Sequence, residues 1–396
     1  MAIKFAHLGD CHLGSWRFPE LQELNMQSFS KAIEICIKDK IDFVLISGDL
    51  FDSAYPPIET LKRTFSEFKK LKENKIPCYL IAGSHDYSAS GKTFLDVLEK
   101  AGFCTNVFKK ETITNETGEI EKQILIPFLE KNVAIYGYPG KKSGLEIEEL
   151  RKIQLQDSPG LFKILMLHTS IKDAIGTLPI DSIDISELPK ADYYALAHLH
   201  IDYCKGNVVY SGPIFPNNFE ELEELKHGTF YIIEVSDIIK CNKMNLKLKE
   251  VESFNIKINN SLTATELILS ELEKKNLEDK IVLLRLFGTI EKGKTSDIRF
   301  QEIEQYIEKK NAFSFLKSVS RLKPEEPELI DFNLENEDID KLEKEIIDQY
   351  MGQNQSKFNN LITPLINVLN YEKQEDEKNT IFQERLFTDL KKVLGL

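Results

Sequence analysis

The sequence lacks any apolar run near the roughly 18 residues that a membrane-spanning helix needs. Its first residues also lack the basic stretch and long apolar core of a secretory signal. We therefore expect a cytoplasmic protein with no membrane partner. The six cysteines are scattered, without the close pairs typical of zinc knuckles or redox motifs. We expect them to be reduced thiols that serve as small packing residues.

An excess of positive charge is missing as well, since 51 Lys and Arg face 64 Asp and Glu and give a net charge of −13. A protein that binds phosphates normally has a basic face. However, the segment from Glu325 to Tyr350 alone carries −9, and the charges from Met351 onward cancel, which leaves −4 for residues 1–324. Two bound divalent ions would offset about that charge, so the acidity does not exclude a nucleic-acid enzyme.

The length of 396 residues exceeds what one core usually organises, which predicts a catalytic domain of roughly 200–250 residues with smaller units attached. Within the first 235 residues, short apolar runs alternate with helical stretches such as 26–38 and 59–73. The expected strands are 3–8, 42–47, 78–82, 133–138, 163–168, 193–197 and 229–235. This alternation predicts an α/β fold with much parallel pairing.

The rest of the chain shows other patterns. Residues 251–322 predict a small α+β domain, and a segment rich in Pro and Glu follows it as a linker. The tail contains helical candidates at 338–351 and 380–394. The expected divisions are 1–245, 246–323, 324–337 and 338–396.

Five of the seven histidines and several aspartates directly follow the predicted strands, in the segments GDCHLG, GDLFD, GSHD, LHTS and AHLH. In an extended segment, residues i and i+2 point to the same face, so Asp10 with His12, and His198 with His200, can each direct two ligands into one cavity. Carboxylates and imidazoles together suit Mn, Fe or Zn. One such motif is weak, and a lone histidine at a strand end is usually structural. Five in order predict a metal site.

These motifs, in their order and spacing, resemble the calcineurin-like metallophosphoesterases. More narrowly, they resemble the nuclease subunit of the double-strand-break repair complex, the meiotic recombination eleven or SbcD family. The narrower match rests on His-Leu-Gly after Asp10, on Gly-Asp-Leu-Phe-Asp, and on Tyr210-Ser211-Gly212 leading into Glu221 and His227-Gly228. The resemblance implies a two-sheet sandwich flanked by helices, a small α+β capping domain, and a helical tail.

The resemblance also implies roles for individual residues. One ion is expected on Asp10, His12 and His200, the other on His168 and His198, with Asp49 bridging the two. Two divalent ions, most simply Mn²⁺, held about 3.5–4 Å apart can drive in-line hydrolysis of a phosphodiester. The activity implied is that of a DNA endonuclease and exonuclease.

Two neighbouring residues are expected to act on the phosphate. His85 would stabilise the developing charge or protonate the leaving oxygen. Asp52 would orient His85, although it could equally cap a helix or a turn. Ser84 occupies a further ligand position, where the family usually has Asn. An amide oxygen binds metal better than a neutral hydroxyl, which predicts a weaker second ion.

Several other features leave alternatives open. The segment 90–93, SGKT, lacks the earlier glycine of a phosphate-binding loop, so Lys92 and Tyr87 are instead candidate DNA contacts. Trp16 and Arg17 could line a DNA groove, but packing is the default interpretation for the indole. Ala197 replaces the family's usual Gly and requires ordinary backbone angles there.

The expected partners are DNA, a second copy of the chain, and an ABC ATPase. In the last helix, Phe382, Leu386, Leu390 and Val393 form an apolar stripe, which could pack on the chain's own core or enter a partner's groove. The resemblance implies that this partner is an SbcC-like ATPase with coiled-coil arms. Phe65, Phe68 and Leu71 form a candidate dimer surface that could also be core. The alternative functions are a phosphatase or small-molecule phosphodiesterase, and a DNA-end tethering scaffold with weak nuclease activity.

Overall fold

The computed structural model describes residues 3–87, 93–114, 120–141, 146–176, 179–324, 347, 356, 358–371, 373 and 379–395. The chain forms two compact units, Met1–Glu325 and Glu326–Leu396. Almost all of the expected linker and of the helix expected at 338–351 lies outside the described residues. Among those that are described, no helix combines the length and apolar character of a membrane span.

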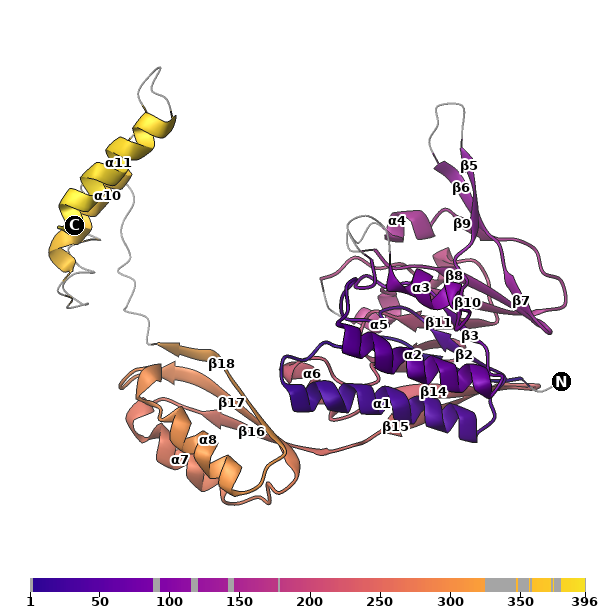
Figure 1. The fold of residues 1–396 in the computed structure, drawn as a ribbon, viewed down its shortest axis with the longest axis horizontal. Helices are drawn as coiled ribbons and strands as arrows, with labels where there is room; N and C mark the ends of the chain where they lie inside the picture. Colours follow the sequence, from indigo (N-terminus) through magenta and orange to yellow (C-terminus); the bar gives the residue numbers. More distant parts are fainter. Residues whose placement is uncertain are drawn as a thin grey trace. The chain divides into compact units, whose positions relative to one another are not determined.

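Two six-stranded sheets form the body of the first unit (Figure 1). The first sheet has the order β15 (Ile239–Leu246), β14 (Gly228–Val235), β1 (Ile3–Leu8), β2 (Phe43–Ile46), β3 (Cys78–Leu80) and β4 (Thr105–Asn106). The second has the order β12 (Asp202–Lys205), β13 (Val208–Ser211), β11 (Tyr193–Ala197), β10 (Phe162–His168), β8 (Val133–Tyr138) and β7 (Phe128–Glu130). Strands β1–β4 are parallel to one another, and so are β8, β10, β11 and β13. The predicted fold class is confirmed.

The core lies in three layers because the central strands are buried on both faces. Between the sheets, Phe5 stacks on Phe43 with ring centroids 5.0 Å apart, and Tyr193 contacts Phe5 edge-on at 5.3 Å. The outer face of the first sheet packs against α1 (Pro19–Lys38), α2 (Ile58–Glu73) and α3 (Phe94–Lys100). The outer face of the second sheet packs against α4 (Glu146–Leu150), α5 (Lys172–Ile175), the 3₁₀ helix η1 (Ile185–Glu187), and a small sheet of β5 (Lys110–Thr114), β6 (Ile120–Leu125) and β9 (Ile153–Leu155).

The face of α2 considered as a dimer surface belongs to this core. Phe68 and Leu71 are fully buried against the first sheet, and Phe65 is half-buried against Phe103 with ring centroids 5.9 Å apart. Of the two interpretations that the sequence left open for this face, the one as core is confirmed. The sequence shows an apolar stripe on α2 but not which side the stripe faces.

The second part of this unit contains a three-stranded parallel sheet of β16 (Glu250–Lys257), β17 (Lys280–Ile290) and β18 (Ser314–Pro324). Helices α7 (Ala264–Leu272) and α8 (Phe300–Lys309) connect the strands and pack on the same sheet, with 3₁₀ turns η2 (Ser261–Thr263) and η3 (Thr295–Asp297). A separate apolar cluster joins this capping region to the start of α1 and to α6 (Phe219–Leu225). Its members are Trp16, Leu21, Leu24, Phe215, Leu222, Ile281, Leu283 and Leu316.

In the second unit, α10 (Asn359–Leu369) packs on α11 (Asn379–Leu394) as a pair of helices. Helix α11 matches the expected 380–394. Its predicted stripe, Phe382, Leu386, Leu390 and Val393, is half-buried. Other apolar side chains of α11 are exposed, among them Ile381, Phe387 and Leu394.

Candidate metal centre

The strands that precede the predicted site residues are central strands of both sheets. Strands β1 and β2 of the first sheet lead into Asp10, His12 and Asp49. In the second sheet, β10 ends at His168, and β11 leads into His198 and His200. The carboxyl ends of parallel strands are where such sheets place ligands. The site therefore lies across the boundary between the two sheets.

We expected an extended backbone at these residues, but the structure shows a left-handed one. Five site residues have positive φ: Asp10 47°, His12 41°, Asp49 50°, His198 108° and His200 52°. Asp and His adopt this region more readily than most residues, though it still carries strain. Backbone hydrogen bonds from Asp10 to Gly48 (3.2 Å) and from His12 to Asp49 (2.9 Å) connect the two loops.

The glycines of the motifs allow this close approach. A Cβ on Gly48, whose φ is +101°, would lie 2.4 Å from His168 Nδ1. A Cβ on Gly83 would lie 2.2 Å from Asp49 Oδ1. A larger residue at either position would push a site residue out of place.

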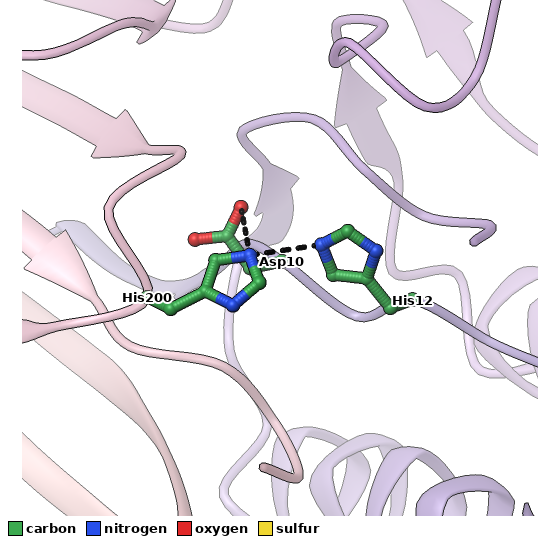
Figure 2. A group of neighbouring side chains, drawn as sticks. All are labelled: Asp10, His12 and His200. Atoms are coloured by element: carbon green, nitrogen blue, oxygen red, sulfur yellow. Dashed lines mark hydrogen bonds and ion pairs between the residues drawn. The ribbon is translucent and has the colours of Figure 1, made fainter. Parts of the chain in front are cut away.

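Asp10, His12 and His200 form the first group of potential ligands (Figure 2). His12 Nε2 and His200 Nε2 are 3.0 Å apart, and His200 Nε2 is 3.9 Å from Asp10 Oδ1. Figure 2 shows dashed lines from one imidazole nitrogen of His200 to both of the other side chains. Asp10 and His12 are almost completely buried.

Asp49 and His168 form the second group, together with Asp10. Asp49 Oδ2 is 3.2 Å from His168 Nε2 and 3.6 Å from His12 Nε2, so one carboxylate contacts both groups. The His198 ring packs against His168 with centroids 5.0 Å apart, and its backbone N–H donates to both oxygens of Asp10 at 3.0 Å. The predicted residues from four strands are thus neighbours.

Hydrogen bonds from Nδ1 orient two of the imidazoles. His200 Nδ1 donates to Glu221 Oε1 at 2.9 Å, and His168 Nδ1 donates to the Ser47 carbonyl at 3.1 Å. Each bond leaves Nε2 facing the carboxylates, an arrangement common for histidine ligands of metals. These roles of Glu221 and Ser47 were not predicted from the sequence. Glu221 could have been noted from its place in the resemblance, but the Ser47 carbonyl could not.

The donor set fits divalent cations. Two buried imidazole nitrogens, His12 Nδ1 and His168 Nε2, have no neighbour with good hydrogen-bond geometry among the described residues, although each lies 3.2–3.3 Å from a carboxylate oxygen. Carboxylate oxygens and imidazole nitrogens of different loops also face one another within 4.8 Å in each group. Buried polar atoms without partners are unfavourable. Cations that accept their lone pairs would satisfy the nitrogens that face the carboxylates.

The electrostatics of the cluster reflect its burial and its two carboxylates. Burial of His200 opposes a positive charge, but Asp10 and Glu221 outweigh it and raise the pKa of His200 to about 9. The pKa of His168 is raised too, because Asp49 outweighs the effect of burial. Burial, reinforced by the charge of His168, lowers the pKa of His198 to about 4 and keeps that ring neutral.

Ser84, His85 and Asp52 lie on the outer side of Asp49. Ser84 Oγ donates to Asp49 Oδ2 at 3.3 Å, and the His85 N–H donates to Asp49 Oδ1 at 2.8 Å. The His85 side chain is 48% exposed, and its ring lies 4.7 Å from that of His12. A half-exposed imidazole beside the cluster can contact an incoming substrate.

Asp52 orients His85 differently from what the sequence suggested. His85 Nδ1 lies 2.8 Å from the backbone carbonyl of Asp52 but 3.9 Å from its carboxylate. The carboxylate instead lies 3.3 Å from His12 Nδ1. The side chain of Asp52 therefore contacts the potential metal ligand His12, and its backbone carbonyl contacts His85.

Asp86, which follows His85, and the residues considered above as DNA contacts are placed as follows. Asp86 is buried and accepts backbone hydrogen bonds from Gly83 (2.9 Å), Leu50 (3.3 Å) and Phe51 (3.1 Å), so it connects two site loops. The Trp16 indole is buried and donates to the Pro216 carbonyl at 2.9 Å, in agreement with its packing interpretation. Arg17 is exposed beside a cavity of about 590 Å³ at the junction with the capping region. Tyr87 packs on the first-sheet core, and Lys92 lies outside the described residues.

Comparison with known proteins places this geometry in context. Residues 3–202 match the model of the calcineurin-like phosphoesterase family. A protein of Methanocaldococcus jannaschii, "DNA double-strand break repair protein Mre11", is 30% identical over 64% of this chain and 70% of its own length. Proteins with the same description from Sulfolobus acidocaldarius and Sulfurisphaera tokodaii are 25% identical (77% and 81% covered) and 32% identical (49% and 48% covered).

Proposed function

Since this chain belongs to the calcineurin-like phosphoesterase family and, within it, to the Mre11 nucleases, we propose that it is a two-metal DNA nuclease acting in double-strand-break repair. Membership of this family shows that the chain is a hydrolase of phosphodiester bonds. The observation that carries the proposal is the converging set of Nε2 lone pairs and carboxylates at the strand ends of both sheets.

The proposal assigns the ligands as follows. Asp10, His12 and His200 would hold one ion, and His168 and His198 would hold the other. Asp49, whose carboxylate contacts His12 and His168, would serve both. Ions bound there polarise the phosphodiester and lower the pKa of water. We take Mn²⁺ as the ion because a mixed set of carboxylates and imidazoles suits it.

His85 is proposed to contact the scissile phosphate or the leaving oxygen. Its ring is half-exposed and is held at Nδ1 by the Asp52 carbonyl, so Nε2 remains available to a substrate. A hydrogen bond donated there stabilises negative charge that develops in the transition state.

The nuclease activity can be separated from that of a general phosphatase. Purified protein titrated with Mn²⁺ should cleave single-stranded DNA far faster than it hydrolyses a nitrophenyl phosphate. His85→Ala should lower kcat by about 10²–10⁴-fold, as expected for loss of general acid catalysis, with little change in metal affinity. Faster turnover of the nitrophenyl ester would favour a phosphatase instead.

Asp52→Asn is the matched control for His85→Ala. It keeps the backbone carbonyl that holds His85 and removes only the negative charge near His12 Nδ1. We expect it to weaken metal binding while kcat at saturating Mn²⁺ changes little. A loss of kcat as large as that of His85→Ala would show that the carboxylate, not the carbonyl, positions His85.

Ser84 favours one alternative, a DNA-end tethering scaffold with weak nuclease activity. Its short hydroxyl donates to Asp49, whereas a longer amide would offer an oxygen to a cation. If DNA is bound and bridged at Mn²⁺ concentrations that give no cleavage, the scaffold is the better description.

The proposed partners are DNA, a second copy of the chain and an SbcC-like ABC ATPase. Helix α11 supports the last of these, since Phe387 (62% exposed) and Leu394 (46% exposed) are seven residues apart and share one face of this helix, which also packs on α10. Such an apolar face suits a groove on a coiled coil. We place the protein in the cytoplasm, where DNA repair would occur in cells without a nucleus.

A further inference from the structure

Two of the six cysteines differ from the rest in their surroundings. Cys11, Cys36, Cys78 and Cys104 are buried in the core beneath α1–α3. Cys204 lies on β12 and is exposed, and Cys241 lies on β15 and is half-buried. They are far apart in sequence, so their spacing gave no sign of a pair.

Strands β12 and β15 are edge strands of different sheets, and side chains of the two strands contact each other. Asp202 of β12 accepts a hydrogen bond from the Tyr231 hydroxyl and forms an ion pair with Lys243 of β15. Tyr231 and Lys243 are directly opposite each other in the first sheet. Asp202 thus connects the two edges of the sandwich.

Cys204 lies two residues from Asp202 on β12, and Cys241 lies two residues from Lys243 on β15. Side chains alternate along a strand, so Cys204 shares the face of Asp202, and Cys241 shares the face of Lys243. Tyr203 packs on the outer cluster of the second sheet, which leaves Cys204 facing inward. Cys241 packs against the inter-sheet core. Burial raises the pKa of the Cys241 thiol to about 12. A hydrogen bond with Cys204 and the charge of the Cys204 thiolate contribute to the same shift.

We propose that Cys204 and Cys241 are a dithiol site that small-molecule disulfides oxidise to an intramolecular disulfide across the open edge of the sandwich. Cys204 is the attacking residue, because it is exposed and Cys241 is not. This inference does not depend on the proposed nuclease activity.

The reaction is two successive thiol–disulfide exchanges. The Cys204 thiolate attacks one sulfur of the small disulfide, which forms a mixed disulfide and releases one thiol. Cys241 then loses its proton to solvent and attacks Cys204 Sγ, which forms the internal bond and expels the second thiol. The protein loses two hydrogens, and the small disulfide is reduced to two thiols.

A bond here would connect parts of the fold that approach the metal centre. His200 lies two residues before Asp202, the first residue of β12. The disulfide would close a loop of about 37 residues that includes β13 and β14, which restricts the unfolded chain and raises the melting temperature by a few degrees.

The test is oxidation of the full-length protein with oxidised glutathione, followed by alkylation and mass spectrometry of peptides. We expect a peptide pair joined through Cys204 and Cys241, with the four core cysteines still alkylated only after unfolding. Cys241→Ser should stop at a glutathione adduct on Cys204, and Cys204→Ser should give neither product.

A stable glutathione adduct on Cys204 in the wild-type protein, with no internal bond, would overturn the proposal. So would a disulfide between two copies of the chain. Because both measurements use the wild-type protein, a variant that fails to fold does not affect the result. Differential alkylation at graded glutathione ratios would then give the reduction potential of the pair.

Discussion

Glu221 accepts the hydrogen bond that fixes which nitrogen of His200 faces Asp10. Glu221→Gln keeps the shape of the side chain but removes its charge. Loss of such an orienting contact typically weakens metal binding 10–100-fold, and we expect a rise of about tenfold in the Kd for Mn²⁺. Calorimetric titration measures it. Glu224→Gln, an exposed residue of the same helix, is the control, and an equal effect of both variants would contradict an orienting role.

At Ser84, the type of side chain and not its position is expected to limit the affinity of the site for metal. Ser84→Asn supplies an amide oxygen near Asp49, so the Mn²⁺ concentration for half-maximal cleavage should fall by about tenfold. Ser84→Ala should leave it unchanged or raise it slightly, since only a weak hydroxyl contact to Asp49 is lost. If Asn does not improve the response to Mn²⁺, Ser84 does not face the second ion.

The raised pKa values of His168 and His200 predict a dependence of metal binding on pH. Without metal, both rings hold a proton at neutral pH, since the pKa of His200 is about 9 and that of His168 is also raised. A metal must displace these protons, so affinity should increase as pH rises toward 9. Calorimetry in buffers of different ionisation enthalpy should show about two protons released at pH 7. Release of none would mean that both rings are already neutral.

At this scale the sequence grouped residues that the structure brings together, but it did not predict their conformation. Asp10, His12, Asp49, His168, His198 and His200 could be grouped because each follows an apolar strand. Their left-handed backbone and the carbonyl of Ser47 could not be predicted, because both depend on tertiary contacts between loops. The role of the Asp52 carboxylate was missed for the same reason: its neighbour His12 is distant in sequence.

Helix α6 and strand β17 are joined by one buried cation. Arg285 is 4% exposed, bonds Glu223 through Nε (2.9 Å) and Nη2 (2.7 Å), and stacks on Phe219 with its Cζ 4.8 Å from the ring centroid. Arg285→Ala leaves Glu223 without its partner, and we expect a loss of about 3 kcal/mol in the free energy of unfolding. Urea denaturation measures it. Arg285→Lys should recover part of the loss, and an unchanged midpoint for Arg285→Ala would contradict the bridge.

Elements were predictable where the pattern is simple. Strands such as β1 and β11 are mostly apolar because they are buried on both faces, and their bounds were found without error. Edge strand β15, IKCNKMNL, carries many polar residues and was missed. Helix α10 contains Pro364, which normally argues against a helix interior. The parallel order of β16–β18 depends on which faces of α7 and α8 are covered, and a single sequence does not specify this.

At the scale of the whole molecule, the site and the predicted ATPase-binding helices fall in different compact units. A chain truncated after Pro324 should therefore fold, bind Mn²⁺ and cleave DNA at a rate similar to the full chain. It also loses the segment of charge −9, so its affinity for DNA should not decrease. Stimulation by an SbcC-like ATPase should disappear. An inactive but folded truncation would show that the tail contributes to catalysis.

The potential ligands come from both sheets, with Asp10, His12 and Asp49 on one and His168, His198 and His200 on the other. A cation held by these residues would cross-link the two sheets. Chelation would destabilise the contact between the sheets before it unfolds either sheet. Amide hydrogen exchange at the strand ends should therefore become faster at chelator concentrations that leave the circular dichroism spectrum unchanged. Because each group of potential ligands combines residues of both sheets, neither sheet alone would hold a cation.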